Sequence, residues 1–223
     1  MAEYTWSFSS LKQYTNCPKQ YYEIRVLKNY TVKENEAMMY GKEVHTALEN
    51  YVRDGVELAK NYQRFKGMVD ALINIKGEKI CEHEMALTYN KEPCEFHDEN
   101  RWVRGIADLV IIDGVDAYVV DYKTGSNKYP DPKQLKLMAI MMFTHFPEVQ
   151  KIKAGLLFVM KNSFLTEEYH RKDMDKLWKS FEQPLKRLET SYDTDEWKAN
   201  PTPLCGWCSV DTCEFYKPRF FPS

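Results

Sequence analysis

Two carboxylates and one ammonium group interrupt apolar parts of the chain at positions where they can act together. Asp108 lies in the aliphatic stretch GIADLVII at residues 105–112. Asp121 ends the stretch AYVVD, and Lys123 follows it two positions later. Both stretches are rich in residues that favour strands. Charged side chains in such core-like strands indicate a functional site more than a solvated surface hairpin, which is the alternative interpretation.

The segment between these strands sets their expected register. Residues 113–116 read Asp-Gly-Val-Asp, which is strong punctuation for a hairpin. If these four residues form the turn, Ile112 pairs with Ala117 and Asp108 lies opposite Asp121. Side chains repeat every two residues along a strand, so the two carboxylates and the lysine are expected on one face. Directly opposed Cβ atoms are about 4.5–5.5 Å apart.

Two opposed carboxylates repel each other unless a cation lies between them. Mg²⁺ and Mn²⁺ prefer oxygen ligands of this kind. Lys123 is placed to approach the same point as a positive charge. The sequence therefore predicts a divalent-metal site at the end of these strands, with an ammonium group beside it.

A histidine upstream is a candidate ligand for the same site. Residues 36–53 carry apolar side chains at helical spacing, and Gly41 and His45 lie one turn apart on one face of this helix. A glycine there lets the helix approach another backbone closely, so that His45 can reach the metal. The alternative is a half-buried histidine with a structural role.

Three further polar residues have places that suit such a site. Gln134 opens an apolar helix after a proline-containing loop, so its amide can face back toward the carboxylates. Glu82 and Glu84 lie on one face of a strand expected over residues 79–89. One of these glutamates can hold water near the metal, or both can be exposed edge residues.

Cysteines near the two ends of the chain form a second candidate centre. Cys205, Cys208 and Cys213 lie close together in the Pro-rich tail, and Cys17 lies in NCPKQYY near the start. Clustered thiolates in an intracellular protein indicate a metal centre rather than disulfides. Four thiolates suit an iron–sulfur cluster and zinc alike, so chemistry alone leaves that choice open.

The bulk properties fit one intracellular, cytoplasmic domain. The chain has 223 residues, 43% of them hydrophobic, and a net charge of −2. It contains no apolar run long enough to span a bilayer and no basic, apolar leader. We expect helices over residues 36–53, 56–75, 134–146 and 174–192, the last kinked or split at Pro184. Strands are expected over residues 79–89, 94–97, 101–112, 117–122, 154–160 and 164–170.

This order of elements predicts an α/β fold on the border of α+β, with a mixed central sheet flanked by helices. We expect a single domain over residues 1–223. Residues 36–192 would form its core, and residues 1–35 and 193–223 would together form an appendage that carries the cysteines.

Four motifs in the same order resemble the PD-(D/E)xK nuclease superfamily, in particular its RecB-like exonuclease branch with a C-terminal cysteine cluster. They are GKEVH at 41–45, GIAD at 105–108, DYK at 121–123 and QLKLM at 134–138. The resemblance covers most of the chain. It implies a restriction-endonuclease-like core and a metal-dependent exonuclease that hydrolyses DNA in recombination, repair or viral DNA processing. The alternative is a non-catalytic DNA-binding or adaptor protein with a degenerate nuclease fold.

The resemblance also assigns roles to individual residues. It implies that Mg²⁺ or Mn²⁺ is bound by four ligands: His45, Asp108, Asp121 and the main-chain carbonyl of Tyr122. Lys123 and Gln134 would complete the catalytic set with the two aspartates. The four cysteines, Cys17, Cys205, Cys208 and Cys213, would hold a structural [4Fe–4S] cluster, with zinc as the alternative. DNA is the implied partner, together with a helicase or a recombination protein.

Overall fold

The structure is a computed structural model, and it describes residues 4–32, 34–128 and 130–217. Its helices are α1 (Phe8–Asn16), α2 (Pro18–Tyr21), η1 (Tyr22–Val26), α3 (Glu36–Asp54), η2 (Gln63–Phe65), α4 (Lys66–Ile73), α5 (Lys133–His145), η3 (Val159–Lys161), η4 (Arg171–Asp173), α6 (Met174–Thr194) and η5 (Pro203–Trp207). Its strands are β1 (Glu78–Thr88), β2 (Pro93–Cys94), β3 (Arg101–Asp113), β4 (Asp116–Lys123), β5 (Lys151–Phe158) and β6 (Ser163–His170). None of the helices in the described residues combines the length and apolar character needed to cross a membrane.

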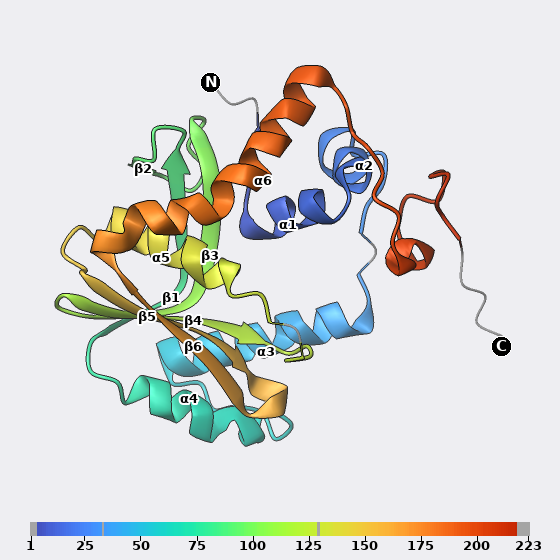
Figure 1. The fold of residues 1–223 in the computed structure, drawn as a ribbon. Helices are drawn as coiled ribbons and strands as arrows, with labels where there is room; N and C mark the ends of the chain where they lie inside the picture. Colours follow the sequence, from blue (N-terminus) through green and yellow to red (C-terminus); the bar gives the residue numbers. More distant parts are fainter. Residues whose placement is uncertain (1–3, 33, 129, 218–223) are drawn as a thin grey trace. The chain divides into compact units, whose positions relative to one another are not determined.

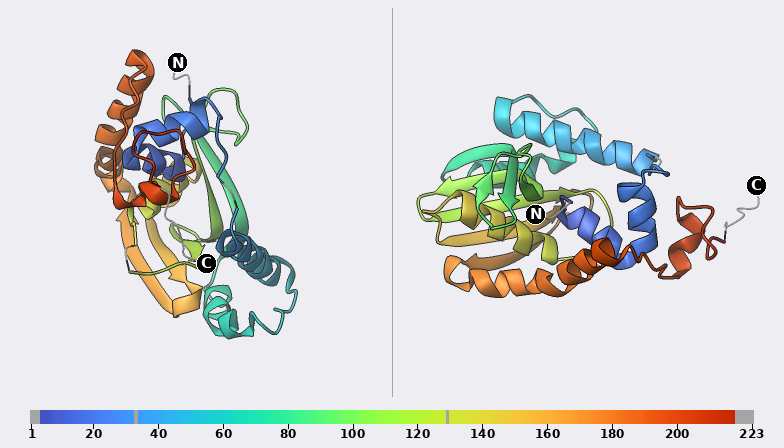
Figure 2. Two further views of the ribbon diagram at one scale, coloured as in Figure 1. Left: turned by 90° about the vertical axis from the view of Figure 1, so that its right-hand side faces the viewer. Right: turned by 90° about the horizontal axis from the view of Figure 1, so that it is seen from above.

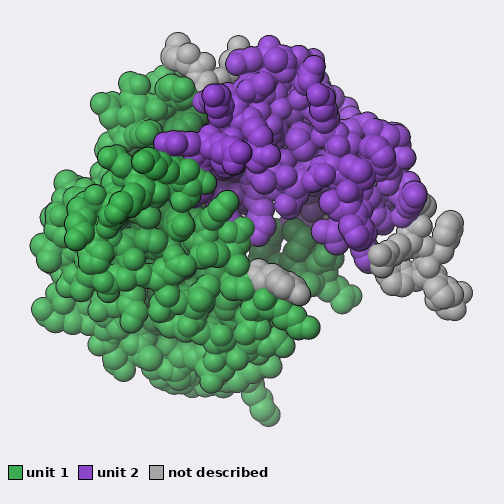
Figure 3. Space-filling view, viewed as in Figure 1, with its two compact units in different colours: residues 1–5, 35–180 green, residues 6–34, 181–223 purple. Residues whose placement is uncertain are grey.

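The chain divides into two compact units, which Figure 3 distinguishes by colour. Unit 1 comprises Met1–Thr5 and Asn35–Ser180, and it contains the whole sheet. Unit 2 comprises Trp6–Glu34 and Phe181–Ser223. It is therefore built from segments near both ends of the chain.

Unit 1 is built on a six-stranded sheet with the strand order β2-β1-β3-β4-β5-β6. Strands β4 and β5 are parallel, and all other neighbours are antiparallel. The parallel pair needs a crossover connection, which α5 supplies. The expected mixed sheet with flanking helices is confirmed (Figure 1).

The β3–β4 hairpin has the expected register but a shorter turn. Ile112 pairs with Ala117, as predicted, but Asp113 also pairs with Asp116, which leaves only Gly114 and Val115 in the turn. Gly114 has φ +63°, the left-handed conformation that tight hairpin turns demand. The ladder ends at Leu109 and Val120, one pair before Asp108 and Asp121.

The sheet is irregular on both sides of Asp108. Between β1 and β3, Cys81 pairs with Leu109 and His83 with Ala107, but Glu82 and Asp108 are not paired. Glu82 has φ +48°, which is unusual for a residue with a side chain. The two ladders that flank Asp108 are thus both interrupted at its level.

The alternation of faces along β3 also changes near Asp108. A Cβ atom on Gly105 would lie 3.1–3.2 Å from Met141 and Met138 of α5. Leu109 instead packs with α3 and α4, in the core cluster that includes Val44 and Val69. Figures 1 and 2 show α3 and α4 on one face of the sheet and α5 on the other. Residues four apart would share a face in a regular strand, so the irregularity at Glu82 and Asp108 re-aims the side chains.

Helix α4 is shorter than expected. The prediction of one helix over residues 56–75 is wrong, since only Gln63–Phe65 and Lys66–Ile73 are helical. The buried side chains of Leu58, Tyr62 and Phe65 have helical spacing. These residues belong mostly to an irregular segment that turns into the core. The helical spacing of apolar residues therefore begins before the helix does, which is why the sequence predicts too long a helix. Helix α6, by contrast, is not split at Pro184.

Unit 2 joins its two chain segments by polar and aromatic contacts. The Tyr14 hydroxyl donates to the Arg187 carbonyl oxygen at 2.7 Å and lies 2.8 Å from the Ser191 hydroxyl. Trp197 stacks on Tyr22, with ring centroids 4.8 Å apart, and on Tyr21 at 5.9 Å. These contacts hold residues from the beginning of the chain against residues from its end.

Candidate metal centre

Three potential metal ligands from three elements meet in unit 1. His45 comes from α3, Glu82 from β1 and Asp108 from β3, and one ligand atom of each lies within 4.8 Å of those of the other two. His45 Nδ1 is 3.4 Å from Asp108 Oδ1. A nitrogen and carboxylate oxygens at this spacing suit a small divalent cation.

The Asp108 carboxylate lies in the gap that the interrupted ladders leave. Its Oδ2 accepts a 2.6 Å hydrogen bond from the Tyr122 backbone N–H, a donor that would otherwise serve the β3–β4 ladder. The residue is only 8% exposed. The sheet itself therefore orients the Asp108 side chain. One carboxylate oxygen accepts a hydrogen bond from the β4 backbone, and the other faces His45.

The second carboxylate, Asp121, is held by an amide and an ammonium group. Its Oδ1 accepts a hydrogen bond from Gln134 Nε2 of α5, and its Oδ2 lies 2.6 Å from Lys123 Nζ. Asp121 is 5% exposed, so this ion pair is largely shielded from water on the carboxylate side. The structure thus brings Gln134, Asp121 and Lys123 together, as the sequence predicts, and it adds that the amide holds the carboxylate.

The electrostatics of the acidic groups favour an added positive charge. Burial, followed by the charges of Asp108 and Glu49, raises the pKa of Glu82 to about 7. Burial and the charge of Asp108 also raise the pKa of Asp121, although Lys123 opposes this. The carboxylates therefore repel one another across a site with too few cations, which is the condition that a divalent metal relieves.

The neighbouring carboxylates favour the charged form of the histidine. Burial lowers the pKa of His45, but the hydrogen bond and charge of Asp108, with the charges of Asp121 and Glu82, outweigh burial and raise it. The imidazole also meets the Tyr122 ring edge-on at 5.9 Å between centroids. His45 thus sits in a negative potential that attracts a proton or a metal ion.

Helix α3 is positioned for close approach by Gly41. A Cβ atom at this position would lie 3.2 Å from Thr124 Oγ1, the residue after Lys123. Asn35 caps the helix through a 2.9 Å hydrogen bond to the Met38 N–H. The predicted role of Gly41 in close approach is confirmed, although the neighbour is a side chain.

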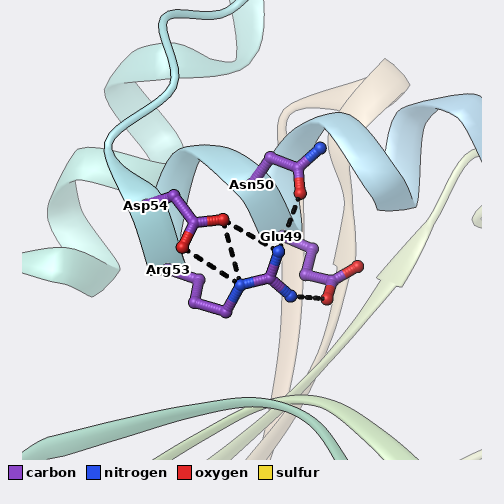
Figure 4. A network of polar contacts seen from close by, with 4 residues as sticks. All are labelled: Glu49, Asn50, Arg53 and Asp54. Carbon is purple, nitrogen blue, oxygen red and sulfur yellow. Dashed lines mark hydrogen bonds and ion pairs between the residues drawn. The ribbon is translucent and has the colours of Figure 1, made fainter.

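Beyond His45, α3 carries an ion-pair network that Figure 4 shows. The Arg53 guanidinium binds Glu49, Asn50 and Asp54, with a distance of 2.8 Å to Asp54 Oδ2. Glu49 is one turn from His45, and its charge contributes to the raised pKa of Glu82. This network neutralises an acidic stretch next to the candidate centre.

Glu82 is the residue that sequence reasoning identified least well. Because Glu82 lies in a strand of alternating pattern, the sequence is equally consistent with an exposed residue on an edge strand. The structure places it with His45 and Asp108 through a left-handed backbone conformation at a broken ladder position. Strained non-glycine conformations concentrate at functional sites. No local residue preference signals this conformation, because glutamate is not a residue that favours it.

The four predicted cysteine ligands lie together in unit 2. Cys17, Cys205, Cys208 and Cys213 line one cavity, with Gln20 and Asn200 among its other walls. Gln20 Nε2 lies 3.4 Å from Cys208 Sγ, and the Asn200 N–H lies 3.5 Å from Cys17 Sγ. Cys81 and Cys94 belong to β1 and β2 of unit 1 and do not line this cavity.

Comparisons with known proteins agree with this fold. The crystal structure of SSO0001 is similar with a TM-score of 0.50 and 13% identity, over 97% of this chain and 89% of the other. A protein from Eubacterium rectale described as a candidate exonuclease is similar with a TM-score of 0.52 and 11% identity, over 98% and 90%. A comparison with curated proteins finds no match. The sequence pattern of the PD-(D/E)XK nuclease superfamily matches residues 5–213. The chain therefore belongs to the PD-(D/E)XK nuclease superfamily.

Proposed function

We propose that this nuclease is a DNA exonuclease that depends on Mg²⁺ or Mn²⁺. The observation that carries the proposal is the meeting of His45, Glu82 and Asp108 beside the ion pair that the buried Asp121 forms with Lys123. Acidic groups with raised pKa values, clustered with a histidine and a lysine, are typical of hydrolytic metal sites.

The residues present fit a divalent metal ion. His45, Asp108 and Asp121 would bind it, as would the main-chain carbonyl of Tyr122, and we add Glu82 as a ligand or as the holder of a water molecule. The fit rests on the donor set, which combines imidazole and carboxylates, and on the raised pKa of Glu82. When bound, such a metal polarises a phosphodiester and makes a water molecule more acidic.

Two further polar residues complete the site: Lys123 can neutralise negative charge on the phosphate, and Gln134 orients the Asp121 carboxylate. The Lys123 ammonium, one-third exposed, can face both Asp121 and an entering phosphate, where it stabilises negative charge that develops on the phosphoryl oxygens. Gln134 holds the Asp121 carboxylate through its amide N–H, which leaves the other oxygen free to exchange between Lys123 and the metal. The chain thus supplies a preorganised negative site with one mobile cation.

We also propose that Cys17, Cys205, Cys208 and Cys213 hold a structural [4Fe–4S] cluster in unit 2. Support comes from their convergence on one cavity. A zinc ion, with Zn–S bonds of about 2.3 Å, brings its sulfurs to within about 4.6 Å of one another. Four thiolates suit this ion as well as a [4Fe–4S] cluster, so the choice of the cluster rests on the family resemblance.

The biological setting that we propose is recombination, repair or viral DNA processing, with a helicase or recombination protein as the partner. The support for this setting is family resemblance. The proposed setting therefore does not follow from the chemistry of the site.

Substrates with and without ends test the exonuclease assignment. The purified protein is incubated with linear duplex DNA, with linear single-stranded DNA and with a covalently closed circle, each in Mg²⁺ or in EDTA. We expect release of nucleotides from a linear substrate in Mg²⁺ and none in EDTA. Equal cleavage of the closed circle would show an endonuclease, and equal activity in EDTA would contradict metal dependence.

A further inference from the structure

We propose that Arg64 and Tyr40 form a binding site for a backbone phosphate of the nucleic-acid strand, beside the scissile phosphate. The proposal rests on the proposed function, because the substrate is the strand that the metal centre cleaves. It adds a contact that none of the four family motifs contains.

The Arg64 side chain is fixed by three neutral groups from different parts of unit 1. Its Nη2 donates to Tyr40 Oη of α3 at 3.0 Å and to Met160 Sδ of η3 at 3.2 Å. Its guanidinium carbon lies 4.9 Å from the centroid of the Phe65 ring. A long exposed side chain is thus held in one position, which lowers the entropy that binding would otherwise cost.

The positive charge on Arg64 has no acidic partner. Within residues 4–32, 34–128 and 130–217, no carboxylate forms an ion pair with it, and the contacts above use only Nη2. An arginine carries five N–H donors, so those on Nε and Nη1 remain available. Arg53 shows the usual alternative, because Glu49 and Asp54 neutralise it (Figure 4).

The Tyr40 hydroxyl is a second hydrogen-bond donor, and the group that accepts from it is a weak acceptor. Its hydroxyl lies 3.4 Å from Met160 Sδ, and a thioether sulfur is a weak hydrogen-bond acceptor. A phosphate oxygen is a much stronger acceptor and would replace the sulfur. Arg64 and Tyr40 therefore offer a cation and a hydroxyl at one point.

This pair lies beside the metal centre along the chain and in space. Tyr40 precedes Gly41, which rests against Thr124, the residue after Lys123. Along α3, Tyr40 is five residues before His45, which is about 7.5 Å of helix axis. Met160 follows β5, whose residue Phe158 pairs with Lys123. Three segments thus bring Arg64 to the Lys123 end of the site.

A guanidinium without an acidic partner in the described residues, next to a hydroxyl donor, is suited to bind a phosphate. At a nuclease site the phosphate that is always available is that of the bound strand. A contact equally strong in the ground and transition states lowers KM and leaves kcat unchanged. Arg64 and Tyr40 are therefore positioning residues for the strand.

The test compares Arg64→Ala, Arg64→Lys and Tyr40→Phe with Lys76→Ala as the control, since Lys76 is an exposed cation that pairs with Asp113 at the turn of the β3–β4 hairpin, away from the Lys123 end of β4. A labelled oligonucleotide is cleaved in Mg²⁺ at several salt concentrations, and its binding is measured by fluorescence anisotropy in EDTA. For Arg64→Ala we expect KM and the dissociation constant to rise about tenfold with kcat unchanged. Its salt dependence should fall by about one unit of log–log slope.

The other variants separate charge from geometry. Arg64→Lys should keep the salt slope and lose part of the affinity, Tyr40→Phe should lose about threefold in affinity, and Lys76→Ala should match the wild type. If Arg64→Ala binds and cleaves like Lys76→Ala, the inference is wrong. If the wild type does not cleave at all, the proposed function fails, and the anisotropy of the same variants still decides whether Arg64 contacts the strand.

Discussion

At the scale of single residues, each buried aspartate of the site has one oxygen on an amide N–H and the other beside a group that titrates. Asp108 is bonded to the Tyr122 backbone and faces His45, whereas Asp121 is bonded to Gln134 and faces Lys123. The amides fix the carboxylates before any ligand enters. The titratable partners are the groups that a metal or a phosphate would displace.

The division of roles predicts different effects for the two partners of Asp121. Lys123→Met should reduce cleavage at least about 100-fold, because it removes the charge that meets the phosphate. It should not weaken Mn²⁺ binding, because it removes a competitor for the Asp121 oxygen. Calorimetric titration with Mn²⁺ measures this. Asp108→Asn is the comparison, and we expect it to lose both properties; loss of Mn²⁺ binding in Lys123→Met would contradict the assignment.

The raised pKa of Glu82 makes the metal-free protein less stable as pH rises. Glu82 binds its proton more tightly in the folded state, with a pKa of about 7, than at its ordinary value of 4.5. Stability from this group is thus full below pH 4.5 and is lost as pH rises through 7. In EDTA at pH 8, Glu82→Gln should raise the free energy of unfolding by about 1–2 kcal/mol, a figure reduced because the side chain is only part-buried.

Urea unfolding at pH 4 and pH 8 checks this linkage. The gain from Glu82→Gln should disappear at pH 4, where the wild-type carboxyl is protonated in both states. Saturating Mn²⁺ should stabilise the wild type more than the variant. A variant that is less stable than the wild type at pH 8 in EDTA would contradict the electrostatic description of the site.

At the scale of elements, the β1–β3 ladder skips Asp108 and the β3–β4 ladder ends just before it, so the strand pairing is broken where the strands carry the site. The Asp108 and Asp121 positions and the hairpin register followed from residue types, spacing and a turn signal. The participation of Glu82 did not follow, because it depends on a left-handed backbone at one position of β1. The limits of α4 did not follow either, because Leu58, Tyr62 and Phe65 keep helical spacing outside the helix. Tertiary packing decides both features.

Helix α3 carries His45 and rests on Thr124 through Gly41, so Gly41→Ala should disturb the site. The new Cβ atom would lie 3.2 Å from Thr124 Oγ1, and the helix or Thr124 must move. We expect cleavage to fall about tenfold, since small displacements at a hydrolytic site have effects of this order. Steady-state cleavage rates and thermal unfolding measure the outcome.

Gly67→Ala is the matched control, since a Cβ atom there meets nothing within 4 Å and the residue is also helical. It should raise stability by about 0.5–1 kcal/mol and leave cleavage unchanged. Adding Thr124→Ala to Gly41→Ala should restore much of the activity, because it removes the atom that clashes. Full activity in Gly41→Ala alone would show that the contact does not position α3.

At the scale of the whole molecule, the chain combines a catalytic unit with a unit built from its two ends. Unit 2 already has contacts between those ends through Tyr14 and Trp197. A cluster on Cys17 and the three C-terminal cysteines would close a long loop, and loop closure stabilises long loops most. The spacing of the three C-terminal cysteines, and the family resemblance for Cys17, predicted which residues converge, but four thiolates by themselves specify neither iron nor zinc.

The metal content of anaerobically purified protein tests the cysteine centre. We expect about four iron atoms per chain and a brown colour, as a [4Fe–4S] centre requires. Cys17→Ser and Cys208→Ser should lose iron and unfold at a lower temperature, whereas Cys94→Ser in β2 should keep its iron. A content of one zinc ion per chain and no iron would contradict the iron–sulfur assignment and would show a zinc site instead.

We propose above all that Asp108 within β3, together with Asp121 and Lys123 at the end of β4, hydrolyses phosphodiester bonds with a divalent metal. The most direct measurement compares wild-type protein with Asp121→Asn on end-labelled linear DNA, with Mg²⁺ or Mn²⁺ present. This account predicts cleavage by the wild type and a loss of at least about 1000-fold in the variant, with its thermal stability retained. Equal cleavage by a folded Asp121→Asn protein would contradict it.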